Sequence, residues 1–172
     1  MQDIEILDKI GSGSYGNVYK AYDKKKKCYR AIKKFKNHYD NVKVCMKEPE
    51  VKVMTKIKHR NIVPLKKVIY EENRLYLIME LCKKNLAELM DDRRATSKSF
   101  TESEIRGYMK DLIHGVKCLH SNGYLHRDLK PENIMVSDEN TLKITDFGTI
   151  KNLRDKPNFT NYVSTRWYRP PE

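Results

Sequence analysis

The chain has 172 residues, of which 39% are hydrophobic and 34% charged, and its formal net charge is +12. This composition allows a buried core, so it excludes a disordered chain and suits one domain or two small lobes. No apolar run approaches the roughly 20 residues that span a bilayer, and the acidic N-terminus with Asp3 and Glu5 does not suit a signal peptide. We therefore expect an intracellular, cytoplasmic protein without a membrane partner.

The cysteines and the basic residues support the same interpretation. The four cysteines lie far apart, with no Cys-x-x-Cys pair and no zinc-like His arrangement, so they predict reduced structural thiols. Residues 1–80 contain 19 Lys/Arg and 10 Asp/Glu, whereas residues 81–172 contain 16 and 13. The four lysines at 24–27 predict a solvated hairpin turn, with an anionic docking surface as the alternative. No nucleic-acid partner is expected, because stacking aromatics and a nucleic-acid-binding motif are both absent.

The first 21 residues predict two strands joined by a glycine-rich turn. Apolar residues recur at Ile4, Ile6 and Ile10, and the strand pattern resumes at Val18. The turn at 11–16 reads Gly-Ser-Gly-Ser-Tyr-Gly. Its glycines let backbone N–H groups approach phosphate oxygens where side chains would collide. Because the turn joins strand to strand, it argues against a Rossmann dinucleotide site; a plain flexible hairpin remains the alternative.

A third strand and a helix follow, and each carries one charged candidate. Residues 29–33 predict a strand that presents Lys33 to nucleotide phosphates. Apolar residues at helical spacing predict a helix over 42–57, in which Glu50 is placed to pair with Lys33. Pairing would hold the amine toward the phosphates, and the alternative is two solvated surface charges. Pro49 inside this helix removes a hydrogen bond, so we expect a kink or a late helix start.

Two further strands, at 65–69 and 75–79, complete a first lobe of five strands and one helix over residues 1–80. Residues 80–82 would connect it to a second, mainly helical lobe over 81–172, with backbone groups available to an adenine edge. Asn85 precedes a short helix at 86–90, and residues 93–99 predict a polar loop. Thr101 and Glu104 form a capping box for a long helix, which Asn122 and Gly123 end.

The most informative stretch is residues 126–133, His-Arg-Asp-Leu-Lys-Pro-Glu-Asn, followed by Asp-Phe-Gly at 146–148. Short strands at 134–136 and 142–144 predict a hairpin between the two motifs. Two acidic groups and an amide in this arrangement suit the positioning of a hydroxyl and of metal-bound phosphates. Asp128 is the candidate to accept the hydroxyl proton, and Lys130 can neutralise charge on the phosphoryl group. Asn133 and Asp146 offer the oxygen ligands that Mg²⁺ prefers.

These segments together resemble the protein-kinase signature set over essentially the whole chain. The matching segments are Gly-x-Gly-x-x-Gly-x-Val at 11–18, Ala-Ile-Lys at 31–33, residues 126–133, residues 146–148 and Pro-Pro-Glu at 170–172. Lys130 after Asp128 is similar to serine/threonine kinases. Residues 163–169 resemble the cyclin-dependent and mitogen-activated kinase group, and Thr-Asn-Tyr at 160–162 resembles its activation-loop motif. Cys-Met at 45–46 and Asn-Leu at 85–86 are similar to male-germ-cell-associated kinases, a branch linked to cilia and flagella.

The resemblance implies an α+β bilobal fold and a serine/threonine kinase that uses ATP and Mg²⁺ on protein substrates. It implies catalytic roles for Lys33, Glu50, Asp128 and Lys130, and metal ligation by Asn133 and Asp146. It further implies that the ATP-binding positions are Ile10, Gly11, Gly13, Gly16, Val18, Ala31, Lys33, Met79, Glu80, Cys82 and Met135. A regulatory spine is implied at Met54, Leu65, His126 and Phe147. Besides the cytoplasm, the same resemblance implies the nucleus, or a cilium or flagellum, as locations of the protein.

Regulation is implied at Thr160 and Tyr162, with Arg127 and Lys151 to capture the phosphate and an upstream kinase as a partner. Pro49 departs from relatives, which commonly carry an Arg there, so we expect weaker coupling between phosphorylation and activity. Thr165 would brace Asp128 and Lys130. Arg169 resembles the residue associated with a preference for proline after the target Ser/Thr.

In the family, a further helical part follows the Pro-Pro-Glu motif, so we expect an incomplete second lobe that ends at the activation segment. We also expect the apolar face of the helix at 101–120 to lack its main partner. A second hypothesis is therefore a non-catalytic, ATP-binding or interaction fragment. Lys33, Asp128, Asn133 and Asp146 favour the enzyme, because a decoy has no chemical need for all four.

Overall fold

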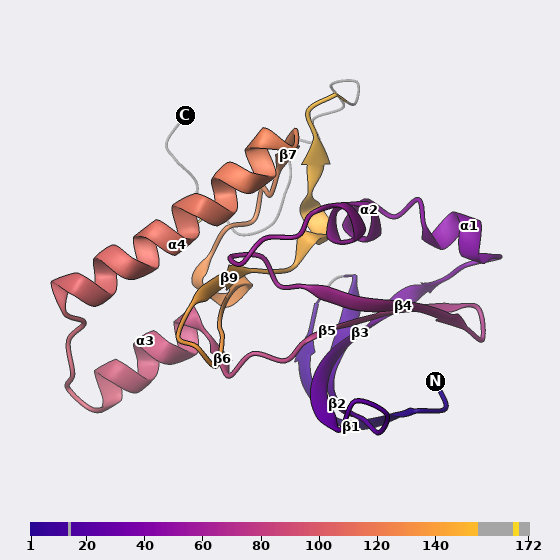
Figure 1. Ribbon diagram of the computed structural model, residues 1–172, viewed down its shortest axis with the longest axis horizontal. Helices are drawn as coiled ribbons and strands as arrows, with labels where there is room; N and C mark the ends of the chain where they lie inside the picture. Colours follow the sequence, from indigo (N-terminus) through magenta and orange to yellow (C-terminus); the bar gives the residue numbers. More distant parts are fainter. Residues whose placement is uncertain (14, 155–166, 169–172) are drawn as a thin grey trace. The chain divides into compact units, whose positions relative to one another are not determined.

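The computed structural model describes residues 1–13, 15–154 and 167–168, and these fold into two compact units (Figure 1). The first unit comprises Met1–Lys58 and Pro64–Leu81, and the second comprises His59–Val63 and Cys82–Glu172. Strands and helices occur in both, so the predicted α+β class is confirmed. The segment 59–63 belongs to the second unit although it lies within residues 1–80, because Ile62 forms a parallel bridge with Ile144.

The first unit is built on a five-stranded antiparallel sheet. The strands are β1 (Ile4–Ser12), β2 (Gly16–Asp23), β3 (Cys28–His38), β4 (Leu65–Glu71) and β5 (Arg74–Glu80), in the order β1-β2-β3-β5-β4. The exposed lysines at 24–27 form the turn between β2 and β3, as predicted. Glu72 and Asn73, with φ of 51° and 58°, form the two-residue turn between β4 and β5. Such turns match the twist of paired strands and thereby fix their register.

Two helices, not one, follow β3 (Figure 1). They are α1 (Val42–Cys45) and α2 (Pro49–Lys56). Pro49 occupies the first turn of α2, where its missing N–H would have no helical partner in any case. The predicted late start is therefore confirmed, and the prediction of a single helix over 42–57 is wrong because proline ends the earlier turn. Val51 and Val53 of α2 are fully buried.

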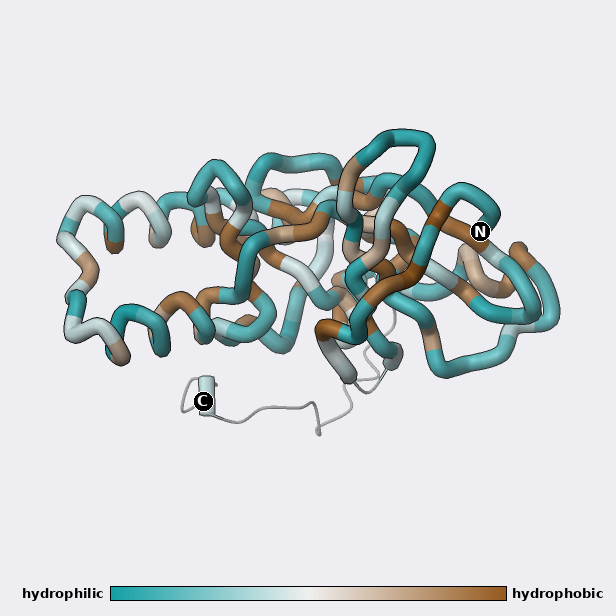
Figure 2. The backbone as a smooth tube through the Cα atoms, turned by 90° about the horizontal axis from the view of Figure 1, so that it is seen from below, coloured by the Kyte–Doolittle hydropathy of each residue, from teal (hydrophilic) through white to brown (hydrophobic). Residues whose placement is uncertain are grey.

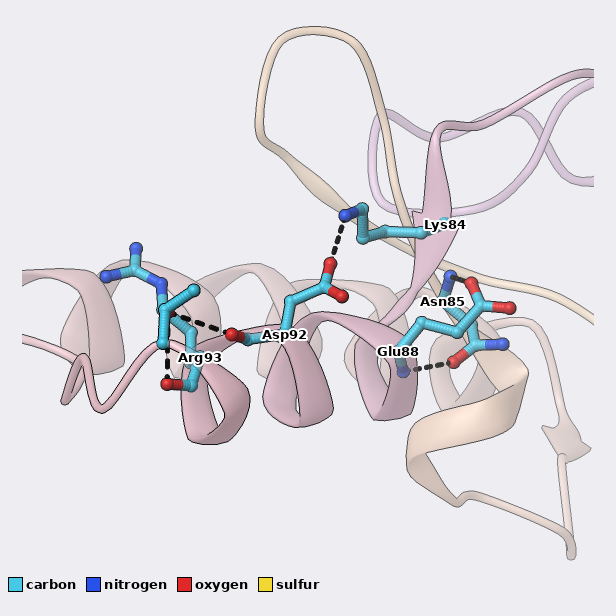
Figure 3. Close-up of polar contacts among 6 residues, drawn as sticks. Lys84, Asn85, Glu88, Asp92 and Arg93 are labelled. Atoms are coloured by element: carbon cyan, nitrogen blue, oxygen red, sulfur yellow. Dashed lines mark hydrogen bonds and ion pairs between the residues drawn. The ribbon is translucent and has the colours of Figure 1, made fainter.

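The second unit contains the helices α3 (Leu86–Ala95) and α4 (Glu102–Ser121). Both begin with a capping box: Asn85 with Glu88, and the predicted Thr101 with Glu104. Helix α3 extends beyond the predicted end at residue 90, so part of the predicted loop at 93–99 is helical. Figure 3 shows how Asn85 and Glu88 exchange hydrogen bonds while Lys84 reaches Asp92 one turn further along the helix. These polar contacts stabilise α3, whose sequence lacks apolar residues at helical spacing beyond residue 90.

The second unit also contains short strands, which form two small sheets beside its loops. β6 (Lys84–Asn85), β8 (Ile134–Val136) and β9 (Leu142–Ile144) form one sheet in that order, and β7 (Tyr124–Leu125) pairs with β10 (Lys151–Asn152). The predicted hairpin at 134–144 is confirmed. Two 3₁₀ turns, η1 (Pro131–Asn133) and η2 (Phe147–Thr149), flank it. Ile134, Val136 and Leu142 form the local core, with Leu86 and Leu112 packed against them.

Helix α4 has a tightly packed side and an exposed apolar side. A Cβ on Gly115 would lie 2.8 Å from both the Asn61 carbonyl oxygen and Ile144 Cδ1, so only glycine permits this contact. Asn61 is itself fully buried, and its Nδ2 donates to the Leu142 carbonyl at 2.9 Å. The exposed large apolar side chains of α4 are Ile105, Met109 and Ile113, at 50%, 50% and 57% exposure.

Polar and apolar stretches alternate along the backbone in Figure 2, and each apolar stretch is short. Within the described parts of the chain, no helix has both the length and the apolar character needed to cross a membrane.

Candidate active site

The glycine-rich turn lies between β1 and β2 in the first unit, as predicted. The Gly13 N–H donates to the Gly16 carbonyl at 2.9 Å, and Lys36 Nζ donates to the Gly13 carbonyl at 2.7 Å. The side chains of Ser12 and Asn17 close the base of the turn, with Ser12 Oγ 2.9 Å from Asn17 Oδ1. The turn is thus held in place at its base and at Gly13 by contacts within its own unit.

The three glycines of this turn differ in whether packing explains the absence of a side chain. A Cβ on Gly16 would lie 2.6 Å from the Lys34 carbonyl oxygen, so the packing of β2 against β3 already requires glycine there. A Cβ on Gly11 or Gly13 would meet nothing closer than 3.5 Å and 3.8 Å, respectively. Packing therefore does not explain Gly11 and Gly13, whereas close approach of a ligand to the backbone would.

Lys33 and Glu50 form a buried ion pair. Lys33 Nζ lies 2.9 Å from Glu50 Oε1 and 2.7 Å from Oε2, and the two side chains are only 8% and 4% exposed. Burial excludes the alternative of two solvated surface charges. Two charge-assisted hydrogen bonds to one ammonium offset part of the cost of removing both charges from water. The amine is thereby fixed in position on the sheet.

The register of the sheet gathers further candidates onto the face that carries Lys33. Val18 pairs with Lys33 across β2 and β3, and Ala31 pairs with Met79 across β3 and β5. Paired residues of adjacent strands project from the same face. Val18, Ala31, Lys33 and Met79 therefore lie on one face of the sheet, which combines apolar side chains with the Lys33 amine.

Two further candidates belong to β1 and β5. Ile10 is 50% exposed. The backbone N–H of Glu80 donates to the Pro64 carbonyl at 3.3 Å.

Tyr39 supports the start of α2, a feature that sequence reasoning missed. Its hydroxyl donates to Glu48 Oε1 at 2.9 Å, and Glu48 is the residue before Pro49. Tyr39 is 5% exposed, and burial together with the Glu48 carboxylate raises the pKa of its phenol. The contact spans nine residues between β3 and α2 and depends on tertiary packing, so local sequence patterns give no signal for it.

In the second unit, Asp128, Lys130 and Asn133 meet in one loop. Asn133 Nδ2 donates to the Asp128 carbonyl at 2.8 Å and to Asp128 Oδ2 at 2.9 Å. Lys130 Nζ lies 3.1 Å from the same Oδ2. Since the side-chain nitrogen of Asn133 points to Asp128, the side-chain oxygen Oδ1 of Asn133 remains as an acceptor for another group. The loop thus holds a carboxylate, an amide oxygen and a cation close together.

His126 anchors this loop from inside. It is 3% exposed, its Nε2 lies 2.9 Å from the Thr145 carbonyl, and its Nδ1 lies 3.3 Å from the Asp128 N–H. A carbonyl can only accept, so Nε2 carries the proton and Nδ1 accepts from Asp128. Burial lowers the pKa of His126 despite the opposing contact with Thr145, so the ring is neutral at pH 7. The neutral ring fixes the backbone of Asp128 and packs edge-on against Phe147, with ring centroids 5.4 Å apart.

Two candidate residues have left-handed backbones. Arg127 has φ of 68° and Asp146 has φ of 58°. This conformation is unfavourable for residues with a side chain, so surrounding contacts must maintain it. Arg127 Nε donates to the Thr149 carbonyl at 2.7 Å, and the Thr149 hydroxyl donates to the His126 carbonyl at 2.9 Å. Thr149, which directly follows the Asp-Phe-Gly motif, is a supporting residue that the sequence interpretation did not single out.

The donor set fits a magnesium ion that is shared with phosphates. The Thr145 N–H donates to the Asn133 carbonyl at 3.0 Å, which joins the backbone segments that carry Asn133 and Asp146. Among the described residues, no group of three or more His, Cys, Asp or Glu side chains is arranged to hold a metal. Mg²⁺ usually binds to one or two carboxylates together with substrate phosphates and water, so one carboxylate and one amide suit it.

The remaining candidates fall into three groups. Cys82 is buried, and Met135 is partly buried and pairs with Asn85 across β6 and β8. Lys151 begins β10 and pairs with Leu125. Thr160, Tyr162, Thr165, Arg169 and the Pro-Pro-Glu segment at 170–172 lie outside the described residues.

The chain matches the model of the protein kinase domain over residues 4–172. It belongs to the protein kinase domain family. Over all 172 residues, it is 42% identical to cyclin-dependent kinase F-3 of Oryza sativa subsp. japonica and covers 39% of that protein. It is also 42% identical to the serine/threonine-protein kinase MAK of Homo sapiens and to ICK of Mus musculus, covering 27% of each. The resemblance predicted from the motifs is thereby confirmed.

The chain thus spans between about a quarter and two fifths of the length of these relatives. Its kinase features include both the ion pair Lys33–Glu50 and the loop that carries Asp128.

Proposed function

We propose that this kinase domain transfers the γ-phosphate of ATP to serine or threonine of protein substrates, with Mg²⁺ as the metal. The observation that carries the proposal is the loop in which Asn133 and Lys130 both contact Asp128 Oδ2, at 2.9 Å and 3.1 Å. Phosphoryl transfer requires an oriented hydroxyl, a bound metal and charge stabilisation near one another, and this loop supplies a group for each.

Each residue then has a role that follows from its chemistry. The Asp128 carboxylate accepts the hydrogen bond of the attacking hydroxyl and receives its proton. The Lys130 ammonium lies beside that carboxylate and neutralises charge on the phosphoryl group. The oxygens of Asn133 and Asp146 would ligate Mg²⁺, which when bound would supply positive charge that stabilises the negative charge of the phosphates.

In the first unit, the roles concern the nucleotide. The Gly11 and Gly13 backbone approaches the phosphates, because no side chain stands in the way. Lys33 contacts the phosphates while Glu50 fixes its direction, which is the role of this pair in kinases. Val18 and Ala31 provide apolar contacts to the adenine, and Glu80 provides a backbone hydrogen bond to its edge. Of the second unit, Met135 would provide an apolar contact and Cys82 a backbone hydrogen bond to the adenine.

Substrate choice and regulation form the finer part of the proposal. Arg169 gives a preference for proline directly after the target residue. Paired peptides with Ser-Pro and Ser-Ala should therefore differ in kcat/KM, and Arg169→Leu should remove the difference. Equal rates for the two peptides with the unsubstituted chain would reject this specificity.

An upstream kinase is the proposed partner that phosphorylates Thr160 in the Thr-x-Tyr motif. Pro49 occupies the position where an Arg would help to hold the phosphate, so its capture rests on Arg127 and Lys151. Phosphorylation should therefore raise activity weakly, and Pro49→Arg should strengthen the response. Strong activation of the unsubstituted chain, lost in Thr160→Ala, would contradict this proposal.

The competing function is non-catalytic nucleotide binding or protein interaction, which the exposed apolar side chains of α4 favour. Two measurements separate the functions: calorimetry of ATP with Mg²⁺, and phosphorylation of a generic basic protein, each with Asp146→Asn as control. Binding with turnover above the control supports the kinase. Binding with turnover equal to the control supports the alternative. For the location, we propose cytoplasm, nucleus or cilium, which imaging of the tagged full-length protein would test.

A further inference from the structure

A basic hollow lies on the sheet of the first unit. It has a volume of about 220 Å³ and is lined by Asn17, Tyr19, Lys34, Phe35, Lys36 and Arg74. These residues belong to three adjacent strands, β2, β3 and β5, with Arg74 at the first position of β5. The hollow is therefore a feature of the sheet itself, supported by regular backbone pairing.

The register places this hollow on the face of the sheet opposite Lys33. Asn17 pairs with Lys34 across β2 and β3, and Lys34 pairs with Tyr76 across β3 and β5. Successive side chains of a strand project to opposite faces, so Lys34 faces away from Lys33. The hollow and the candidate nucleotide residues are thus on two different faces of one sheet.

The charges around the hollow are all positive. Lys34, Lys36 and Arg74 line it, and none of the lining residues is acidic. Glu71 pairs with Arg74 in the sheet register, but its carboxylate forms an ion pair with the N-terminal ammonium of Met1 at 3.0 Å. Three cations around one small volume repel one another unless an anion lies between them.

Two of the three cations donate hydrogen bonds to backbone carbonyls, and the third lies near an aromatic ring. Arg74 Nη1 donates to the Lys36 carbonyl at 2.7 Å, and Lys36 Nζ donates to the Gly13 carbonyl at 2.7 Å. Lys34 Nζ lies 5.6 Å from the centre of the buried Tyr76 ring. Each of these hydrogen bonds uses a single donor, whereas an ammonium has three and a guanidinium five. The cations are pre-positioned and retain donors for a ligand.

We propose that this hollow binds a phosphate group, either as free phosphate or on a phosphorylated side chain. The lining offers three cationic groups, the Asn17 amide and the Tyr19 hydroxyl. A carboxylate has only two oxygens, whereas a phosphate monoester has three terminal oxygens and up to two negative charges. The tetrahedral dianion therefore matches both the number of donors and the charge of this site.

Lys36 links the hollow to the glycine-rich turn. Its ammonium belongs to the lining, and the same ammonium holds the Gly13 carbonyl. The Lys36 N–H also donates to the Tyr15 carbonyl at 3.1 Å, so backbone and side chain both contact the turn. An anion that attracts Lys36 therefore perturbs the turn from the far face of the sheet.

The test is an NMR titration of the ¹⁵N-labelled 172-residue chain at constant ionic strength. Inorganic phosphate, a phosphoserine peptide and the same peptide with glutamate at that position are the three titrants. The Arg74 Nε–Hε signal reports on the hollow, and the Gly13 amide reports on the turn. We expect both phosphate-bearing titrants to shift the Arg74 signal with saturation, and the glutamate peptide to bind about tenfold more weakly.

Variants distinguish this site from the nucleotide residues. Arg74→Gln should weaken phosphate binding about tenfold and reduce the Gly13 shift, because one charge-assisted contact is lost. The double variant Lys66→Gln with Lys67→Gln removes two exposed charges of β4 and should leave the affinity within about twofold of the starting chain. Lys36→Gln should also weaken the Arg74 response about tenfold, because another charge-assisted contact is lost, and it should lose the Gly13 response. An Arg74 signal that does not saturate, or a Gly13 shift that persists in Arg74→Gln, would overturn the proposal.

Discussion

The buried ion pair Lys33–Glu50 allows a quantitative prediction for Glu50→Gln. In this variant, a neutral amide replaces a carboxylate whose two oxygens lie 2.9 Å and 2.7 Å from Lys33 Nζ. The side chains are 8% and 4% exposed, so water does not replace the lost anion. Breaking such a buried pair on one side usually costs about 3–5 kcal/mol, and we expect the free energy of unfolding to fall by about 3 kcal/mol.

The assay is urea unfolding monitored by circular dichroism, and the chain supplies a matched control. Glu102 pairs with Arg106 through Nε at 3.0 Å, but both side chains are 79% exposed. Glu102→Gln should therefore change the free energy of unfolding by less than about 0.5 kcal/mol. The double variant Lys33→Met with Glu50→Leu removes both charges and should lose less stability than Glu50→Gln alone. Equal effects of Glu50→Gln and Glu102→Gln would refute the buried pair.

Three further substitutions test the packing within the units. Gly115→Ala places a methyl group 2.8 Å from the Asn61 carbonyl and should destabilise the chain by about 1–3 kcal/mol in urea unfolding. Gly107→Ala in the same helix meets nothing within 4 Å and should stabilise it by up to about 1 kcal/mol. Tyr39→Phe removes the hydrogen bond to Glu48 and should cost about 1–2 kcal/mol at pH 7. Because the folded state raises the pKa of Tyr39, this contribution is complete below the ordinary value of 10.0 and declines as the pH rises above it.

Each of these predictions has a result that would contradict it. A Gly115→Ala chain as stable as Gly107→Ala would mean that α4 does not pack closely on the Asn61 backbone. For Tyr39, the stability of the unsubstituted chain should fall more steeply between pH 10 and 12 than that of Tyr39→Phe. Parallel curves over that range would show that the phenol is not buried beside Glu48.

Local signals in the sequence predicted the elements that local interactions determine. The capping box at Thr101 and Glu104 fixed the start of α4, and Gly123, with φ of 80°, marked its end. Pro49 predicted the late start of α2, because proline acts on its own turn. In contrast, α3 continues past residue 90 through polar contacts such as Lys84 with Asp92, which leave no apolar periodicity.

Contacts between distant segments were the part that sequence patterns could not predict. The segment 59–63 joins the second unit through the pairing of Ile62 with Ile144, 82 residues later. The hydrogen bond from Tyr39 to Glu48 likewise has no local signature. The motif residues Lys33 and Asp128 were identifiable because chemistry constrains their type and order. Thr149 gave no such signal, because it accepts the Arg127 Nε–H through its backbone carbonyl, which any residue offers.

The central claim is phosphoryl transfer by the loop that carries Asp128, and one measurement tests it most directly. Purified chain, ATP and Mg²⁺ are incubated with a serine-containing basic peptide, and the product is located by mass spectrometry. We expect phosphate on the serine hydroxyl and a kcat that falls by about 10²–10⁴ in Asp128→Asn, because the proton acceptor is lost. Turnover of the unsubstituted chain that is no greater than that of Asp128→Asn would contradict the claim.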